Sequence, residues 1–249
     1  MFSFLFDIDD TVYDQLSPFA QAFEKHFDHH ASLPLKDLYL YSRKFSDEVF
    51  ERSESGEMGR REMHIYRITK AFQVFDVQIT PEEALGFQYD YETFQKNIRL
   101  LPDVIQALDY CKTHRLPLGV ITNGPRDHQH NKVKQLGLER WILPEHVFVS
   151  NEIGIAKPDK RIFLHAQYTM NLEPETTYYV GDSYANDVIG AKQAGWKAIW
   201  INRRGIAPLS ADVRPDYVAE EQCSIAEIVS GICEQGQEKR EGHIIQRGI

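Results

Sequence analysis

The residues best suited to chemistry in this sequence begin with Asp7-Ile8-Asp9, directly after a short apolar run. Side chains two residues apart in a strand start on the same side of the backbone, which brings the two carboxylates together. Carboxylates about 4 Å apart repel by roughly 4 kcal/mol at an effective dielectric of about 20, so they need a cation or a shared proton. A bound Mg²⁺ would leave Asp7 free to attack phosphorus, and a raised pKa would make Asp9 a proton donor. The alternative is an acidic cluster that only caps the next helix.

A second acidic segment, Gly181-Asp182 with Asp187 further along, follows another apolar run and opens a helix. Mg²⁺ takes oxygen ligands and usually keeps several waters, so one or two carboxylates added to Asp7 would complete a site. Asp182 fits that role. Asp187, one helical turn into the segment, could hold a metal-bound water or pair with a lysine. Acidic residues at a helix start are also common N-caps, so this segment alone leaves both interpretations open.

Two further segments could stabilise negative charge. The Thr122 hydroxyl and the Asn123 amide, at the end of an apolar run, can donate to phosphate oxygens, and Gly124 lets the backbone turn closely around them. Lys157, which precedes a proline, could offset the charge of Asp7 and a phosphate. Each segment has a plainer alternative, because Asn-Gly is often only a turn and Lys-Pro often only precedes a helix.

Short apolar runs rich in aromatic and β-branched residues indicate the strands of a buried parallel sheet. Helical segments lie between them at residues 102–114 and 185–194, and Gly195 is the expected C-cap of the second. This alternation predicts an α/β fold with a Rossmann-like doubly wound parallel sheet, in which ligands bind beyond the carboxyl ends of the strands. The runs cover residues 2–8, 116–122, 146–150, 177–181 and 197–202, with a further strand expected at 216–219.

Residues 13–99 break this alternation, because they are strongly charged and helically periodic without a convincing strand. They are predicted to form an inserted α-helical cap subdomain, and an insert that leaves the sheet at the strand ends would cover the site as a lid. The α/β catalytic core is then expected at residues 1–12 and 100–233. Residues 234–249 are expected to form a flexible polar tail.

Composition narrows the classes of function. The formal charge is −9, from 28 basic and 37 acidic residues, which disfavours nucleic acid and anionic membranes as partners. Three scattered cysteines without a C-x-x-C pair argue against a disulfide framework or a zinc ribbon. The first apolar run is interrupted too early for a signal peptide and no run is long enough to span a membrane, so a cytoplasmic protein is expected. The sequence is compatible with any oligomeric state.

Two groups of polar residues in the insert are interpreted as structural. His26, His29 and His30 form a His-rich stretch, for which a solvated helix face is favoured over a metal site because no cysteine or carboxylate pattern supports it. Most cations of the insert are interpreted as surface salt-bridge partners, although a lid over a phosphate ester often contributes selectivity contacts. These cations are Arg43, Arg60, Arg61 and Arg67.

Taken in order, the four segments resemble the signature of the haloacid dehalogenase superfamily. The match covers about residues 1–202, with the strand at 216–219, and the insert resembles the helical cap of the subgroup that places it after the first motif. The D-x-D-x-T motif is met by Asp7, Asp9 and Thr11, the hydroxyl motif by Thr122, the lysine by Lys157, and the G-D-x-x-x-x-D motif by Gly181, Asp182 and Asp187.

The resemblance implies a role for each of these residues. Asp7 is implied as the nucleophile, Asp9 as the acid and base, and Thr122 with Lys157 as the groups that stabilise phosphate and charge. The implied cofactor is Mg²⁺, bound by Asp7, the backbone carbonyl of Asp9, and Asp182, with Asp187 in support. The second Asp of the first motif separates this chain from the true dehalogenases, which lack that acid and base.

The expected activity is therefore that of a Mg²⁺-dependent phosphatase acting on a small phosphorylated metabolite. Ile-Thr-Asn-Gly with Ile-Ala-Lys-Pro looks most like bacterial members that act on nucleoside monophosphates, which suggests a nucleotidase. One alternative is a sugar phosphomutase of the same fold, in which a second hydroxyl replaces water. Another is a non-hydrolytic phospho-receiver protein, which the Asp-x-Asp spacing and the long insert disfavour.

Overall fold

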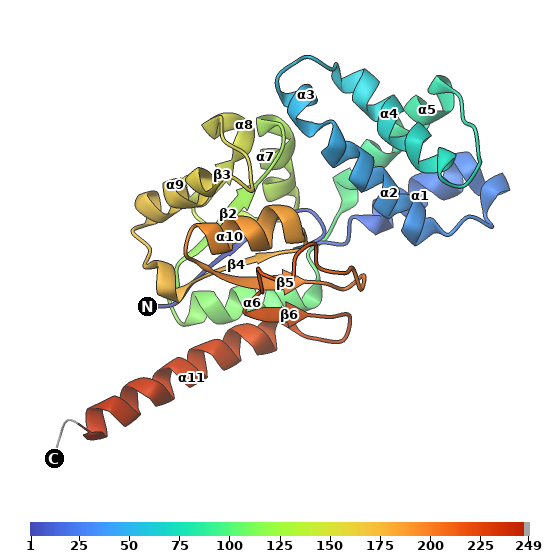
Figure 1. The fold of residues 1–249 in the computed structure, drawn as a ribbon. Helices are drawn as coiled ribbons and strands as arrows, with labels where there is room; N and C mark the ends of the chain where they lie inside the picture. Colours follow the sequence, from blue (N-terminus) through green and yellow to red (C-terminus); the bar gives the residue numbers. More distant parts are fainter. Residues whose placement is uncertain (247–249) are drawn as a thin grey trace. The chain divides into compact units, whose positions relative to one another are not determined.

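The chain forms two compact units. The computed structural model describes residues 1–246 of the 249, with side chains through residue 236. The first unit joins Met1–Tyr13 to the chain from Arg99 onward and holds the sheet, whereas the second, Asp14–Ile98, is helical (Figure 1). None of the helices in the described chain combines the length and the apolar character that a membrane span requires.

Six parallel strands make the sheet of the first unit, in the order β3-β2-β1-β4-β5-β6 (Figure 1). The predicted α/β fold with a doubly wound parallel sheet is confirmed. The first strand is shorter than expected, because the chain leaves the sheet after Phe6 and turns. The strands are β1 (Ser3–Phe6), β2 (Leu118–Thr122), β3 (Val147–Val149), β4 (Thr177–Gly181), β5 (Lys197–Ile201) and β6 (Tyr217–Ala219).

Strand β1 lies inside the sheet, hydrogen-bonded along both edges. Phe6 aligns with Val120 of β2 and with Val180 of β4. Every residue of β1, β2 and β4 is buried, as expected for parallel strands covered on both faces. The residues that follow these three strands therefore emerge side by side at one edge of the sheet.

Helices cover both faces of this sheet. Helices α6 (Pro102–Thr113) and α11 (Ile225–Gln246) pack together on one face, and α9 (Lys160–Met170) and α10 (Ile189–Gln193) lie on the other (Figure 1). Phe163 of α9 anchors the second face, with its ring centroid 5.1 Å from that of Tyr179. The other helices of the unit are α7 (Arg126–Gln135), α8 (Ser150–Ile153), the 3-10 helices η3 (Leu138–Arg140), η4 (Pro144–His146) and η5 (Pro174–Thr176), and the π-helix η6 (Tyr184–Val188).

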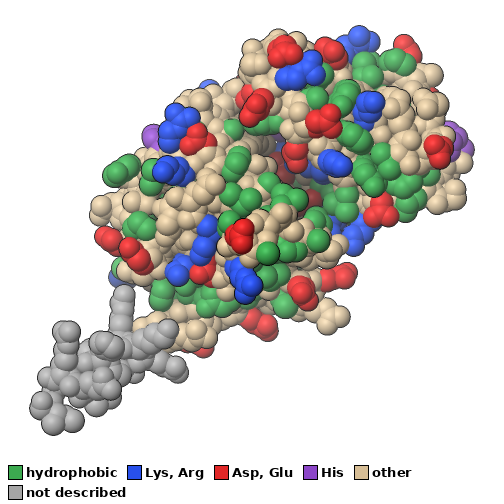
Figure 2. All heavy atoms as spheres, viewed as in Figure 1, with side chains coloured by type: hydrophobic (Ala, Val, Ile, Leu, Met, Phe, Trp, Pro, Cys, Tyr) green, Lys and Arg blue, Asp and Glu red, His purple; other side chains and the backbone are tan. Residues whose placement is uncertain are grey.

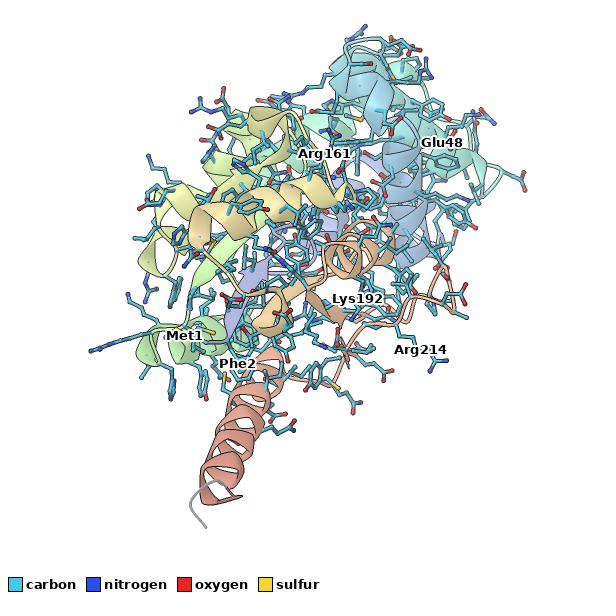
Figure 3. The ribbon with its side chains drawn as sticks, turned by 60° about the vertical axis from the view of Figure 1, so that its left-hand side comes forward. Met1, Phe2, Glu48, Arg161, Lys192 and Arg214 are labelled. Carbon is cyan, nitrogen blue, oxygen red and sulfur yellow. The ribbon has the colours of Figure 1, made fainter. Side chains whose placement is uncertain are left out.

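Helix α11 occupies most of the stretch for which a flexible tail was expected. It packs against the start of the chain, since a Cβ at Gly236 would lie 2.3 Å from the Phe2 ring (Figure 3). Ile232 and Cys233, one turn earlier, are buried. Residues 247–249 of the expected tail lie outside the described residues, and its flexibility stays a prediction.

The second unit, described over its full length, contains helices and no strand. Its core is rich in aromatic rings, with centroids 4.6 Å apart for Phe27 and Phe72 and 4.9 Å apart for Phe19 and Phe87. The helical character predicted for residues 13–99 is thus confirmed. The helices are α1 (Leu16–Phe27), η1 (Asp28–His30), α2 (Leu35–Glu48), α3 (Phe50–Glu54), α4 (Arg60–Gln73), α5 (Pro81–Phe94) and η2 (Gln95–Asn97).

Two polar residues of this unit are more enclosed than the sequence suggested. His26 Nε2 lies 2.6 Å from Asp90 Oδ2, and the His26 side chain is only 25% exposed. Arg67, interpreted with the surface cations, is buried and donates to Gln88 Oε1 at 2.5 Å. Both side chains sit where one helix packs on another, which periodicity on a single helix does not reveal.

The surface carries charges of both signs. On the face drawn in Figure 2, Lys and Arg side chains are interspersed with Asp and Glu, and no broad basic area is visible there. Mixed charge of this kind is ordinary for a protein with a net charge of −9.

Candidate active site

Three neighbouring strand ends bring together residues that are far apart in the sequence. Asp7 follows β1, Thr122 ends β2, and Asp182 follows β4, and β1 lies between the other two strands. The backbone N–H of Asp7 donates to the carbonyl of Val180 at 2.8 Å, which holds this residue to the sheet. Asp7 is 6% exposed, so this residue is buried and does not lie on the open surface.

Lys157 supplies the cation of this site. Its Nζ donates to Asp7 Oδ1 at 2.7 Å, to Asp187 Oδ1 at 2.7 Å and to the Tyr179 hydroxyl at 2.9 Å. The Lys157 side chain is 3% exposed. Burial works against its charge, but the carboxylates of Asp187 and Asp7 raise the pKa of Lys157 well above its ordinary value. A buried, fully charged ammonium therefore faces the predicted nucleophile.

Asn123 holds the loop that carries Lys157. The Lys157 N–H donates to Asn123 Oδ1 at 2.9 Å, and Asn123 Nδ2 donates to the Lys157 carbonyl at 2.9 Å. The side-chain amide expected to meet phosphate is thus used to join two loops. Sequence reasoning missed this pairing because the two residues lie on separate loops, 34 positions apart.

The Thr122 hydroxyl is a donor with no partner in the part of the chain that the structure describes. Its Oγ1 is buried and has no hydrogen bond to any described residue. Buried hydroxyls nearly always have a partner, so an orphan at the end of a strand points to a ligand atom. A phosphoryl oxygen beside Asp7 would satisfy it.

The protonation of Asp7 depends on its surroundings. Burial raises the pKa of Asp7 from 3.8 to about 7, Lys157 opposes the shift, and Asp187 and Asp9 add to it. Burial and the neighbouring carboxylates thus outweigh Lys157, and together they disfavour the ionised form of Asp7. A divalent cation would complete the neutralisation and favour the ionised form.

The second acidic motif forms an unusual turn. Residues Tyr184–Val188 form the π-helix η6, in which the Val188 N–H reaches back to the Ser183 carbonyl at 3.4 Å. The wide turn points Asp187 back along the chain, where its Oδ2 accepts from the Ser183 N–H at 2.8 Å. A Cβ at residue 181 would lie 2.3 Å from that carboxylate, which explains the glycine there. The single helix expected at residues 185–194 is thus η6 followed by α10.

Oxygen ligands gather at this edge of the sheet. One carboxylate oxygen from each of Asp7, Asp182 and Asp187 lies within 4.8 Å of the others. Both oxygens of Asp187 already accept, Oδ1 from Lys157 and Oδ2 from the Ser183 N–H, whereas Lys157 donates only to Oδ1 of Asp7. Asp7 and Asp182 are therefore the carboxylates best placed for a cation. An all-oxygen set with one or two carboxylates suits Mg²⁺, so the residues present fit the predicted metal.

The Asp9 carboxylate does not belong to this group. Lys132 Nζ donates to both of its oxygens, at 2.6 and 2.7 Å, and Gln129 Nε2 donates to Oδ2 at 3.3 Å. The Tyr13 hydroxyl also donates to Asp9 Oδ1. Because β1 has ended by Phe6, the period of two no longer determines where Asp9 points. The metal ligand expected from Asp9 is its backbone carbonyl, and this stays a prediction.

Lys132, Gln129 and Tyr13 were not identified from the sequence. One signal was available: Gln129 and Lys132 are spaced to share one face of α7, which begins just after the Thr122 loop. Tyr13 and Asp10 lie close to Asp9 in the sequence, but their types and spacing predicted no role for them. Asp10, with a φ of 57°, accepts a hydrogen bond from Arg204.

Comparison with known proteins identifies the family. The family of haloacid dehalogenase-like hydrolases matches residues 3–195. The chain belongs to this family. The superfamily that the motifs predicted is thereby confirmed, and the haloacid dehalogenase-like chain shares its fold with a solved structure that holds magnesium. The HAD-hydrolase YfnB from Bacillus subtilis bound to magnesium has a TM-score of 0.64 and 25% identity, over 87% of this chain and 92% of that one.

Two curated relatives are named for phosphatase activity. A glyceraldehyde 3-phosphate phosphatase from Methanothermobacter thermautotrophicus is 34% identical over 200 residues, which cover 79% of this chain and 84% of the relative. A phosphoserine phosphatase from Thermus thermophilus is 33% identical over 136 residues, which cover 55% of this haloacid dehalogenase-like chain and 53% of the relative.

Proposed function

We propose that this protein is a Mg²⁺-dependent phosphatase that hydrolyses a small phosphate monoester through an aspartyl-phosphate on Asp7. The observation that carries the proposal is the convergence of Asp7 and Asp182, at adjacent strand ends, with Lys157 from the loop after α8 and with the orphan hydroxyl of Thr122. A nucleophilic carboxylate, a fixed cation and an unused donor are the groups that displacement at phosphorus requires. The names of the two phosphatase relatives support the same reaction class.

In the proposed first step, an Asp7 oxygen forms a bond to phosphorus while the bond to the leaving oxygen breaks. Asp9 donates its proton to that oxygen, which departs as an alcohol. Asp9, now ionised, takes a proton from the water that attacks the aspartyl-phosphate, and inorganic phosphate and free Asp7 result. Thr122 Oγ1 and Lys157 Nζ stabilise the charge on the phosphoryl oxygens. A magnesium ion held by Asp7, the Asp9 carbonyl and Asp182 would supply further positive charge there.

For the substrate, we propose a small sugar or amino-acid phosphate. The relatives described above are named for glyceraldehyde 3-phosphate and phosphoserine, and not for nucleotides. These names do not support the predicted nucleotidase. Hydrolysis of nucleoside monophosphates stays a prediction from the sequence motifs alone. A panel of triose, hexose and amino-acid phosphates together with nucleoside monophosphates ranks these classes by kcat/KM.

The nucleophile is tested with Asp7→Asn. We expect this variant to lose more than about 10³-fold of the Mg²⁺-dependent turnover of a generic phosphate ester, because an amide oxygen cannot form the aspartyl-phosphate. Asp127→Asn, at an exposed residue with a side chain 93% accessible, is the matched control and should keep full activity. Retention of most turnover by Asp7→Asn would remove Asp7 from the mechanism.

The same assay separates the alternatives. Release of free phosphate indicates hydrolysis, whereas conversion of one hexose phosphate isomer into another indicates a mutase. A phosphoprotein that persists after acetyl phosphate treatment, with no turnover of any ester, would indicate a receiver.

A further inference from the structure

The carboxylate of Asp9 is positioned by a helix that carries none of the four family motifs. Helix α7 begins just after the Thr122 loop, and it presents Gln129 and Lys132 on one face toward Asp9. Gln129 Nε2 also donates to the Asn123 carbonyl at 2.9 Å. One face of α7 therefore connects the loop after β2 to the loop after β1.

The side chain of Lys132 is far less exposed to solvent than that of an ordinary surface lysine. Its side chain is 6% exposed and that of Asp9 is 16% exposed. A lysine in such a place needs a partner for its charge, and within the described residues its ion-pair partner is Asp9. The two contacts of 2.6 and 2.7 Å place Nζ between both carboxylate oxygens, so rotation of the carboxylate would break at least one of them.

We propose that Lys132 is a positioning residue that holds the Asp9 carboxyl group where it exchanges a proton with the leaving oxygen. This inference rests on the proposed phosphatase function. Lys132 acts through Asp9 and contacts no reacting atom. A general acid must lie within hydrogen-bond distance of the oxygen that it protonates, so a small rotation of Asp9 is enough to slow the step. The proton moves from Asp9 to the leaving oxygen as the P–O bond breaks, and Asp9 later recovers a proton from the attacking water.

If Lys132 positions the general acid, the effect of its loss should depend on how much the leaving group needs protonation. The alkoxide of an alkyl phosphate is a poor leaving group, so it needs the proton from Asp9. The p-nitrophenolate of p-nitrophenyl phosphate is stable as an anion and needs almost no protonation. The parameter kcat/KM reports only the steps up to formation of the aspartyl-phosphate. The ratio of kcat/KM for the two esters therefore measures protonation of the leaving group, whatever fraction of the enzyme is active.

The experiment compares Lys132→Met with the wild type on p-nitrophenyl phosphate and on glycerol phosphate, each with saturating Mg²⁺. We expect kcat/KM for glycerol phosphate to fall by about 10²-fold, and that for p-nitrophenyl phosphate by less than about threefold. Asp9→Asn should show the same split more strongly. Lys134→Met, on the same helix at an exposed residue, is the matched control and should leave both values unchanged.

The outcomes separate this inference from the function on which it rests. An equal loss on both esters, or no loss on either, would overturn the positioning role while leaving the phosphatase assignment intact. A raised KM with an unchanged kcat for both esters would also overturn it, because that pattern marks a substrate-binding cation. A wild type that hydrolyses neither ester, or an active Asp7→Asn variant, would overturn the phosphatase function itself.

Discussion

Lys157 shows how a single side chain shapes the site. Its ammonium lies between the carboxylates of Asp7 and Asp187, each at 2.7 Å, and the Lys157 side chain is almost completely buried. Two carboxylates and one ammonium leave a net negative charge in a buried place, which a divalent cation can neutralise. The residue that the sequence suggested only as a charge on a loop is therefore the electrostatic centre of the site.

Removal of this cation should destabilise the folded protein. Lys157→Met leaves two buried carboxylates without a counter-charge, so we expect the free energy of unfolding without divalent ions to fall by roughly 3–5 kcal/mol. Urea titration followed by circular dichroism in EDTA measures the change.

The double variant Lys157→Met/Asp187→Asn tests the cause. It should lose less stability than the sum of the two single variants, because the uncompensated charge of Asp187 has been removed. Lys160→Met, an exposed lysine nearby, is the control. Strict additivity of the single changes would mean that Lys157 and Asp187 do not interact energetically.

At the scale of elements, helix α5 has the most fully capped N-terminus in the second unit. Thr80 Oγ1 accepts from the Glu83 N–H at 3.2 Å, and Glu83 Oε2 accepts from the Thr80 N–H at 2.7 Å. Pro81 occupies the first helical position, where its missing N–H has no cost. The Thr80 hydroxyl also donates to Glu83 Oε2, at 3.0 Å. The hydrogen bonds from the Thr80 N–H and from this hydroxyl lower the pKa of the Glu83 carboxyl group below its ordinary value of 4.5.

Thr80→Ala should therefore weaken the helical unit in a pH-dependent way. We expect it to lower the free energy of unfolding by about 1 kcal/mol at pH 7. A carboxyl group with a lowered pKa stabilises the folded state above its ordinary pKa, and this contribution disappears as the pH falls through the folded value. The difference between variant and wild type should thus shrink at acidic pH. Thr93→Ala, within the same helix but away from its start, serves as the control, and an effect independent of pH would contradict the role of Glu83.

Two elements departed from the sequence-based expectation for physical reasons. The π-helix η6 exists because Asp187 is drawn back to Lys157 and to the Ser183 N–H, a tertiary preference that overrides regular α-helical spacing. Helix α11 continues through Gln246, whereas a polar sequence suggested a tail. Its contact between Gly236 and Phe2 holds the last helix against the start of the chain, which no local pattern encodes.

For the whole molecule, the strand order decides where charge accumulates. Because β2 and β4 flank β1, the carboxylates of Asp7 and Asp182 meet at one edge of the first unit. Ions that bind the folded state but not the unfolded chain raise stability by mass action. Metal binding should therefore be measurable without any substrate.

Addition of Mg²⁺ at about a hundred times its Kd should stabilise the wild type by about 2.7 kcal/mol, and EDTA should reverse the effect. Asp182→Asn should lose most of this gain because one of two ligand carboxylates is missing. Differential scanning calorimetry in the two conditions measures it, with Asp127→Asn as control. The same increase in Tm for Asp182→Asn as for the wild type would place the ion elsewhere.

The sequence by itself determined the family, the parallel α/β sheet and the set of residues at the strand ends. A buried parallel strand appears in the sequence as a continuous apolar run, and the polar residues directly after it lie at the carboxyl end of the sheet. Both features can be read from short segments of the chain. Only the tertiary structure decided which polar groups pair. Lys132 and Asp9 are 123 positions apart, and Lys157 and Asp7 are 150 apart. Such pairings depend on how helices and loops pack around the sheet, and packing is a property of the folded chain as a whole.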